Sequence, residues 1–211
     1  IGVVGEPSDW LVASMPDAAA VRDIWGPVLV TVPLSELEVA IDAASEEDVA
    51  AHAASLAGDA SGVVEPSEDE VADVARVHVG LSTIVERYGL DAVTVRCFDL
   101  VLDRKTTGCF ALSALTDAGV MAGCEGDVVS TVGLLWAHLL TGEVPWMANP
   151  ARLDERENTI KLAHCTVPRG LVERYRLRSH FESGLGVGIQ GDIPLGPVTL
   201  LRIGGTMMDA L

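Results

Sequence analysis

The sequence Met121-Ala122-Gly123-Cys124-Glu125-Gly126-Asp127 joins a short apolar run to the start of a helix, and the α/β character of the chain is clearest there. Apolar residues then recur at three- and four-residue spacing, at Val128, Val129, Val132, Leu135 and Leu139. This spacing predicts a helix with Asp127 as its N-cap and Gly142 as its C-cap. The apolar run before it predicts a strand, so Glu125 stands where a strand gives way to a helix.

Glu125 is the first candidate site residue. A carboxylate at this junction lies at the carboxyl end of its strand, where open α/β sheets bind ligands. Glu125 has no structural task between small residues, whereas helix capping accounts for Asp127. Asp99 follows a second apolar run, residues 92–98, which predicts a neighbouring strand. The two carboxylates could face one cleft, and the alternative for Asp99 is a loop cap.

Residues 1–145 alternate predicted strands with predicted helices, which is typical of an α/β domain with an open, mostly parallel sheet. Strands are predicted at residues 1–5, 28–32, 92–98 and 120–124, and helices at 34–44, 45–56, 67–89 and 107–117. Ser67 and Glu70 form a capping box at the start of the long third helix. Gly2 and Gly5 are not followed by a G-x-G-x-x-G pattern, which excludes a dinucleotide fingerprint.

After Pro145 the helical periodicity stops. Short alternating or apolar runs follow, separated by glycine and proline, at residues 159–166, 175–181, 186–190 and 198–203. They predict a mainly antiparallel β domain over residues 146–211. The chain begins at Ile1 inside an apolar run and stops at Leu211, so we expect further sequence on both sides and a β domain that is incomplete at its carboxyl end.

The charge of the chain limits its partners. The formal net charge is -17, with 31 acidic residues against 14 lysines and arginines. Such a surface repels phosphate backbones and anionic lipids, so neither nucleic acid nor a membrane surface is expected as a partner. The acidic, lysine-poor composition also suggests a halophilic protein, kept soluble in high salt, where repulsion between like charges is screened.

Four cysteines, Cys97, Cys109, Cys124 and Cys165, contain no CxxC pair and lie in apolar surroundings. We interpret them as reduced, buried thiols of a cytoplasmic protein and do not expect a zinc site built on them. The sequence has no run of eighteen apolar residues, so no membrane-spanning segment is predicted. His52 and His78 lie on predicted helices without a partner three or four residues away, and packing accounts for them better than metal binding.

Several short motifs follow one another: Val95-Arg96-Cys97-Phe98-Asp99, Cys124-Glu125-Gly126-Asp127, Trp146-Met147-Ala148-Asn149-Pro150, Leu162-Ala163-His164-Cys165-Thr166, Arg178-Ser179-His180-Phe181-Glu182 and the glycine-rich residues 184–191. Their order and spacing resemble the L-fucose isomerase and L-arabinose isomerase superfamily. The resemblance implies an α/β domain followed by a β-barrel-like domain, a divalent cation, usually Mn²⁺, between them, and a homo-oligomer. It also implies interconversion of an aldose and a ketose through an enediol, with the cation polarising the sugar carbonyl.

The resemblance assigns roles to individual residues. Glu125 matches the first metal-binding carboxylate of the family, and His164 matches a histidine near the metal or the substrate. Asn149 stands where relatives carry a second carboxylate; its amide oxygen can bind a metal but cannot act as a base. The implied metal ligands are Glu125, His164 and Asn149, and the implied substrate contacts are His164, Asn149 and His180. Glu125 and Asp99 are the candidate catalytic carboxylates, and we predict that Glu125 and His164 lie within about 12 Å of each other.

Two functions remain open from the sequence. The first is a metal-dependent sugar isomerase, and the second is a catalytically silent carbohydrate-binding or regulatory homologue, which the missing second carboxylate favours. A sugar receptor of the periplasmic kind would need stacked aromatic side chains. Aromatic residues make up 4% of the chain and its four tryptophans are scattered, which disfavours that class.

Overall fold

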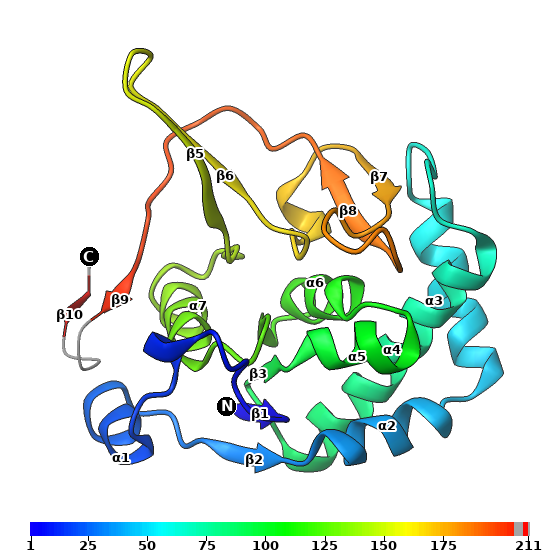
Figure 1. Cartoon of the computed structure of the whole chain (residues 1–211), viewed down its shortest axis with the longest axis horizontal. Coiled ribbons are helices and arrows are strands. Elements are labelled where there is room, and N and C mark those ends of the chain that lie inside the picture. Colours follow the sequence, from blue (N-terminus) through cyan, green and yellow to red (C-terminus); the bar gives the residue numbers. More distant parts are fainter. Residues whose placement is uncertain (205–208, 211) are drawn as a thin grey trace.

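The computed structural model describes residues 1–204 and 209–210, and a four-stranded parallel sheet organises their first part (Figure 1). Its strands run in the order β2-β1-β3-β4. They are β1 (Gly2–Val4), β2 (Val30–Val32), β3 (Ala92–Val95) and β4 (Met121–Gly123). Gly2 pairs with both Val30 and Val93, and Ala92 pairs with Met121. All three pairings are parallel, as the alternation of strands and helices in the sequence predicts.

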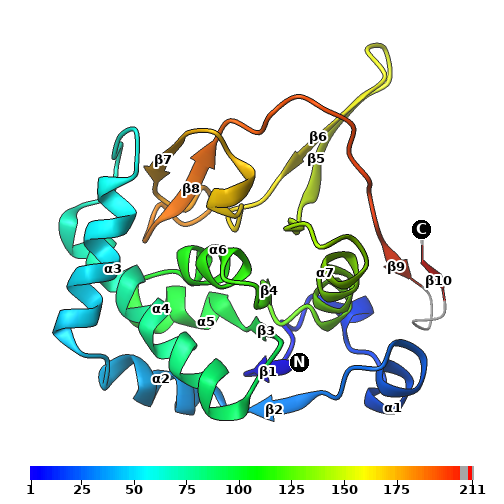
Figure 2. The ribbon, with the colours of Figure 1, turned by 180° about the vertical axis from the view of Figure 1, so that it is seen from behind.

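Helices cover both faces of this sheet (Figures 1 and 2). The helical elements are η1 (Val12–Ser14), α1 (Ala18–Ala20), η2 (Val21–Trp25), α2 (Leu34–Asp42), α3 (Glu46–Gly58), α4 (Glu68–Tyr88), α5 (Cys97–Arg104), α6 (Cys109–Asp117), α7 (Val128–Thr141) and η3 (Arg169–Leu171). One apolar cluster joins the sheet to α2, α4, α5 and α6, and a second joins it to α7 and η2. Among the described residues, no helix is both long enough and apolar enough to cross a bilayer.

The predicted helix ends of α4 and α7 are confirmed. The Asp127 carboxylate accepts a hydrogen bond from the Ser130 backbone N–H at 2.8 Å, and Gly142 ends α7 with a φ of 71°. Ser67 and Glu70 form the reciprocal capping box at the start of α4, which ends at Gly89. These ends were predictable because capping depends on residues that are close in sequence.

The second part of the chain forms antiparallel strand pairs. They are β5 (Asn149–Asp154) with β6 (Thr159–Ala163), β7 (Tyr175–Arg178) with β8 (Gly188–Gly191), and β9 (Ile203–Gly204) with β10 (Asp209–Ala210). The predicted antiparallel character is confirmed, but the pairs are separate two-stranded sheets and the described residues form no closed barrel. The β5–β6 ribbon projects from the body of the molecule (Figures 1 and 2). Its register shifts by one residue between Pro150 and Arg152, where a β-bulge interrupts the ladder.

The β7–β8 pair packs on the helices of the first part. A third apolar cluster contains Leu56 and Val71 from α3 and α4, Phe110 from α6, and Tyr175 and Ile189 from the strand pair. The Tyr175 hydroxyl also donates to the Leu56 carbonyl at 3.0 Å. The domain boundary near residue 145 stays a prediction, and this apolar cluster contains residues from both sides of it.

Several predicted boundaries are wrong. The strand predicted over residues 92–98 ends at Val95, and Cys97 begins α5, so Asp99 lies in the first turn of a helix. The apolar residues after Arg96 suit a helix as well as a strand, because Cys97 and Leu100 face the core at helical spacing. The run at residues 198–203 is not a strand before Ile203. Conversely, β5 was not predicted, because it contains a proline and is largely exposed.

Candidate functional site

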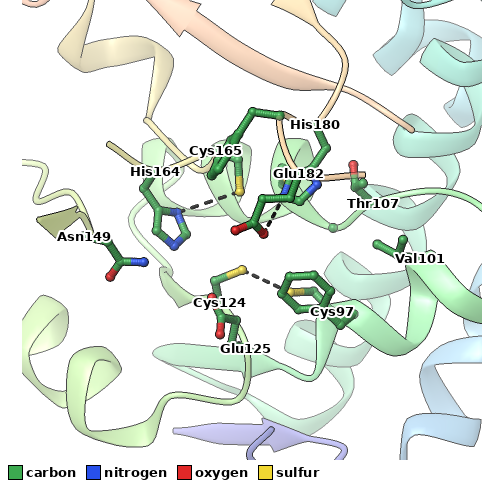
Figure 3. A pocket seen from close by; sticks show the side chains of 14 residues that line it. Cys97, Val101, Thr107, Cys124, Glu125, Asn149, His164, Cys165, His180 and Glu182 are labelled. Carbon is green, nitrogen blue, oxygen red and sulfur yellow. Dashed lines mark hydrogen bonds and ion pairs between the residues drawn. The ribbon is translucent and has the colours of Figure 1, made fainter. Parts of the chain in front are cut away.

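A cavity lies at the carboxyl edge of the parallel sheet, below the β5–β6 and β7–β8 pairs (Figure 3). Its volume is about 40 Å³, and it is partly open to solvent. Its walls come from α5 and the start of α6, the loop after β4, the base of the β5–β6 ribbon and the loop after β7. The lining residues are Cys97, Phe98, Val101, Thr107, Gly108, Cys109, Cys124, Glu125, Asn149, His164, Cys165, His180, Phe181 and Glu182.

Glu125 lies two residues after the end of β4, in a tightly fixed loop. Its φ is 62°, in the left-handed region, and its carbonyl accepts a hydrogen bond from the Ser8 backbone N–H at 2.9 Å. The next residue, Gly126, also has a positive φ, and a Cβ there would lie 2.6 Å from the Pro7 Cα. The Trp10 indole N–H donates to Glu125 Oε2 at 2.8 Å. The loop after β1 therefore fixes both the backbone and the carboxylate of Glu125.

His164 and Asn149 reach the cavity from the base of one ribbon. Asn149 begins β5 and pairs with Ala163, and His164 follows Ala163 in the chain. The Thr166 hydroxyl lies 2.8 Å from His164 Nδ1, which leaves Nε2 as the ring nitrogen available to a ligand. Figure 3 shows His164, Asn149 and Glu125 arranged around the cavity.

Glu125 and His164 come together as predicted. A carboxylate oxygen of Glu125, a ring nitrogen of His164 and the sulfur of Cys124 all lie within 4.8 Å of one another. The predicted proximity of Glu125 and His164 is thus confirmed, while their roles stay predictions. Together with the amide of Asn149 on the same cavity, they offer the oxygen and nitrogen donors that suit a divalent cation such as Mn²⁺.

The third member of this group is the thiol of Cys124, which is hydrogen-bonded within the cavity wall. Hydrogen bonds to Cys165 and Cys97, together with burial, raise its pKa well above the ordinary value. The Cys97 and Cys124 sulfurs are 3.0 Å apart. Beside this sulfur, the group offers the carboxylate oxygen of Glu125 and the ring nitrogen of His164.

His180 lines the same cavity. It is 6% exposed, and its Nδ1 lies 3.0 Å from the Ser183 hydroxyl. A hydrogen bond with Cys165 is the main cause that raises the pKa of His180. Glu182, which the sequence analysis did not single out, also lines the cavity, with Oε2 4.0 Å from His180 Nε2.

Asp99 is not brought to the cavity. Its carboxylate is paired with Arg96, at 3.0 Å from Oδ2 to Nε, and Arg96 also binds Asp9. Asp99 lines a separate surface hollow with Gly5 and other residues of the loop after β1. The expectation that Asp99 shares a cleft with Glu125 is therefore not met, because the chain turns into α5 three residues earlier than predicted.

The sequence analysis did not predict that cysteines line the cavity. All four thiols are free, and Cys109, Cys165 and His180 offer ligand atoms that lie within 4.8 Å of one another. Hydrogen bonds from Cys109 and Cys124, and weaker ones from His164 and His180, lower the pKa of the Cys165 thiol. Cys165 is also partly exposed, which corrects the prediction that every cysteine is buried. These residues are far apart in sequence, so spacing alone could not group them.

Known proteins give distant matches only. No family model matches the chain. Sulfoquinovose isomerase of Clostridium sp. (strain MSTE9) is 28% identical over 123 residues, which cover 58% of this chain and 26% of that protein. Sulfoquinovose isomerase of Alkalicoccus urumqiensis is 22% identical over 222 residues, covering 98% of this chain and 48% of that protein. The protein of the same name from Priestia aryabhattai is 22% identical over 146 residues, 66% of this chain and 33% of that protein.

The chain thus spans about half the length, or less, of the curated relatives it matches. It is a distant relative of proteins named as isomerases of a sugar. This supports the isomerase part of the resemblance seen in the sequence, while the L-fucose and L-arabinose isomerase superfamily remains a prediction.

Proposed function

We propose that this chain belongs to a metal-dependent sugar isomerase that interconverts an aldose and a ketose through an enediol. The observation that carries the proposal is the meeting of the Glu125 carboxylate and the His164 imidazole within 4.8 Å, at the carboxyl edge of the sheet. The distant relatives named sulfoquinovose isomerase support it. A cytoplasmic homo-oligomer, with part of each site supplied by sequence outside this chain, remains part of the proposal.

Glu125, His164 and Asn149 would hold the divalent cation, with Mn²⁺ proposed on account of the oxygen-rich donor set. The chemistry that such a cation supplies is polarisation of the sugar carbonyl, which makes the neighbouring C–H more acidic. Trp10 and Thr166 hold Glu125 and His164 in place through the hydrogen bonds already described. The orientation of the metal-binding side chains is therefore fixed before a ligand binds.

The proton transfer between C1 and C2 needs a base that is not bound to the metal. Asn149 cannot serve, and Asp99 lies outside the cavity with its carboxylate paired to Arg96. Glu182 lines the cavity and its side chain is 55% exposed, so it can approach a bound sugar. We therefore assign the proton transfer to Glu182 in place of Asp99.

The second candidate function is a silent carbohydrate-binding or regulatory homologue. It is favoured by one observation, the amide of Asn149 at the position where the family resemblance implies a carboxylate. A single carboxylate weakens cation binding, because an amide oxygen carries no formal charge.

Turnover of the complete protein that contains this chain, with Mn²⁺ and with sulfoquinovose, fucose or arabinose as substrate, tests the proposal. We expect ketose formation from at least one sugar, a loss of kcat of at least about 100-fold in Glu182→Gln, and a change of only a few-fold in the control Asp99→Asn. If calorimetry instead shows that the wild type binds sugar without turnover, and Asn149→Asp then gains turnover, the silent homologue is established. Neither binding nor turnover with any of these sugars would refute both functions.

A further inference from the structure

A second group of metal-binding atoms lies in the same cavity, beside the Glu125 group. The sulfurs of Cys109 and Cys165 and a ring nitrogen of His180 are all within 4.8 Å of one another. They come from the first turn of α6, from the loop after β6 and from the loop after β7. Cys109 is 3% exposed and His180 is 6% exposed, so two of the three are shielded from solvent. Cys165 and His180 are seen together in Figure 3.

We propose that Cys109, Cys165 and His180 form a binding site for a thiophilic divalent cation, with Zn²⁺ as the preferred ion. Zn–S bonds of about 2.3 Å at tetrahedral angles place two sulfur ligands roughly 3.8 Å apart. Atoms within 4.8 Å of one another can reach that geometry through small side-chain rotations. The site does not depend on the proposed isomerase activity.

The scaffold around the three residues is rigid enough to hold them. In the loop of His180, the Gly184 N–H donates to the His180 carbonyl at 2.7 Å, and the His180 N–H donates to the Leu185 carbonyl at 3.0 Å. Gly186 has a φ of 57°, and a Cβ there would lie 2.8 Å from the Thr107 nitrogen. The loop of His180 therefore packs directly on the segment that leads into α6 and Cys109.

The His180 ring is oriented for metal binding by its second nitrogen. The Ser183 hydroxyl lies 3.0 Å from Nδ1, and the Ser183 backbone N–H donates to the same nitrogen at 3.3 Å, so Nε2 is the ring nitrogen left for the cation. Hydrogen bonds at the outer ring nitrogen fix the orientation of metal-binding histidines.

The two groups of ligands in the cavity differ in the cations they prefer. Thiolate sulfur with imidazole selects Zn²⁺, whereas carboxylate and amide oxygens with imidazole suit Mn²⁺. The groups are neighbours, since the Cys165 sulfur is 3.9 Å from His164 Nδ1. Three protein ligands would leave the fourth tetrahedral position open, as in zinc sites that bind a water or a substrate, and all three residues line the cavity.

Spectroscopy with cobalt tests the site in the 211-residue chain, reduced with a phosphine that does not bind zinc. Co²⁺ bound by thiolates gives an intense sulfur-to-cobalt charge-transfer band in the near ultraviolet, and added Zn²⁺ should remove the band by displacement. We expect the band in the wild-type chain and in Glu125→Gln, and its loss in Cys165→Ser. Zinc affinity, measured by competition with a chelator, should fall by more than about 100-fold in Cys165→Ser, because losing a ligand costs more than losing an outer hydrogen bond.

Cys97→Ser is the matched control, since Cys97 is a cavity thiol outside the proposed ligand set and should leave the band and the affinity unchanged. A second measurement needs no variant: Zn²⁺ should protect Cys165 of the wild-type chain from alkylation by iodoacetamide, read by peptide mass spectrometry. Absence of the charge-transfer band together with unprotected Cys165 would overturn the proposal. So would zinc binding that is lost in Glu125→Gln and kept in Cys165→Ser, since only the Glu125 group would then bind metal.

Discussion

The Trp10 indole N–H donates to Glu125 Oε2 over 2.8 Å, although 115 residues separate the two in the chain. The indole also stands edge-on to Phe98 of the cavity wall, with ring centroids 5.3 Å apart. Trp10 is 56% exposed, so burial of the ring is not what holds it there. We conclude that the Trp10 side chain positions the carboxylate of Glu125.

Replacing Trp10 by phenylalanine should therefore weaken binding of Mn²⁺ by the Glu125 group by roughly 10-fold, since outer hydrogen bonds to metal ligands contribute on that scale. Titration calorimetry of the two chains measures the difference. Asp9→Asn is the control, because Asp9 lies in the same loop but binds Arg96. Equal affinities in Trp10→Phe and wild type would show that the indole does not position the carboxylate.

Gly126→Ala should destabilise the chain more than Gly142→Ala. The two glycines have nearly the same φ, 72° and 71°, so both variants carry a left-handed backbone cost of about 1–2 kcal/mol. A Cβ at Gly126 would also lie 2.6 Å from the Pro7 Cα and 2.8 Å from the Glu6 carbonyl oxygen, whereas nothing lies within 4 Å of one at Gly142. Urea unfolding should show the difference in the free energy of unfolding. An equal decrease in the free energy of unfolding in the two variants would mean that the loop of Glu125 can move to accommodate the added Cβ without further destabilisation.

Because of His78, the folded chain should be less stable in mild acid than at neutral pH. Burial, reinforced by the charges of His52 and Arg169, lowers the pKa of His78 from 6.5 to about 4, and its Nδ1 has no hydrogen-bond partner in the described part of the chain. Between these two pKa values the unfolded chain binds a proton that the folded chain does not. The free energy of unfolding therefore falls as the pH drops from 6.5 to 4, by about 3 kcal/mol from this residue.

His78→Leu should remove that pH dependence, and His52→Leu, at an exposed position of α3, should keep most of it. Unfolding by urea at several pH values between 4 and 7 measures each slope. The assignment to His78 is refuted if His78→Leu retains the slope of the wild-type chain.

Salt should stabilise the folded chain. Its 31 acidic residues face 14 basic ones, and screening weakens their mutual repulsion most at the surface. We expect the thermal midpoint to rise steadily as sodium chloride increases from low to molar concentration. A midpoint that stays flat or falls would mean that the acidic surface is not an adaptation to salt.

The sequence predicted the parallel sheet and the ends of its long helices because that information is local. Asp127 and Gly142 end α7 through contacts within a few residues, and the alternation of apolar runs sets the order of strands and helices. Asp99 shows the limit of this reasoning. The same apolar residues suited a strand or a helix, and an error of three residues at the end of β3 moved Asp99 from the predicted cleft to the surface.

The candidate site was predictable only in part. Glu125 stood out because a glutamate between small residues at a strand end has no structural task, and His164 stood out through a family resemblance. Glu182 and the group of Cys109, Cys165 and His180 depend on how the β7–β8 pair packs over α6. That packing joins elements far apart in the sequence, so the spacing of residues along the chain does not reveal it.

The β-bulge in the β5–β6 ribbon separates the register at its tip from the register at its base, where Asn149 reaches the cavity. Pairs near the tip of the ribbon, such as Leu153 with Ile160, follow one register, and pairs at its base, such as Asn149 with Ala163, follow a register shifted by one residue. A β-bulge takes up one extra residue on one strand, and here that residue lies between Pro150 and Arg152. Removing it would join the two registers into one regular ladder and leave Asn149 opposite Ala163. The ribbon can therefore lose one residue at that position and still present the amide of Asn149 beside His164 at the cavity.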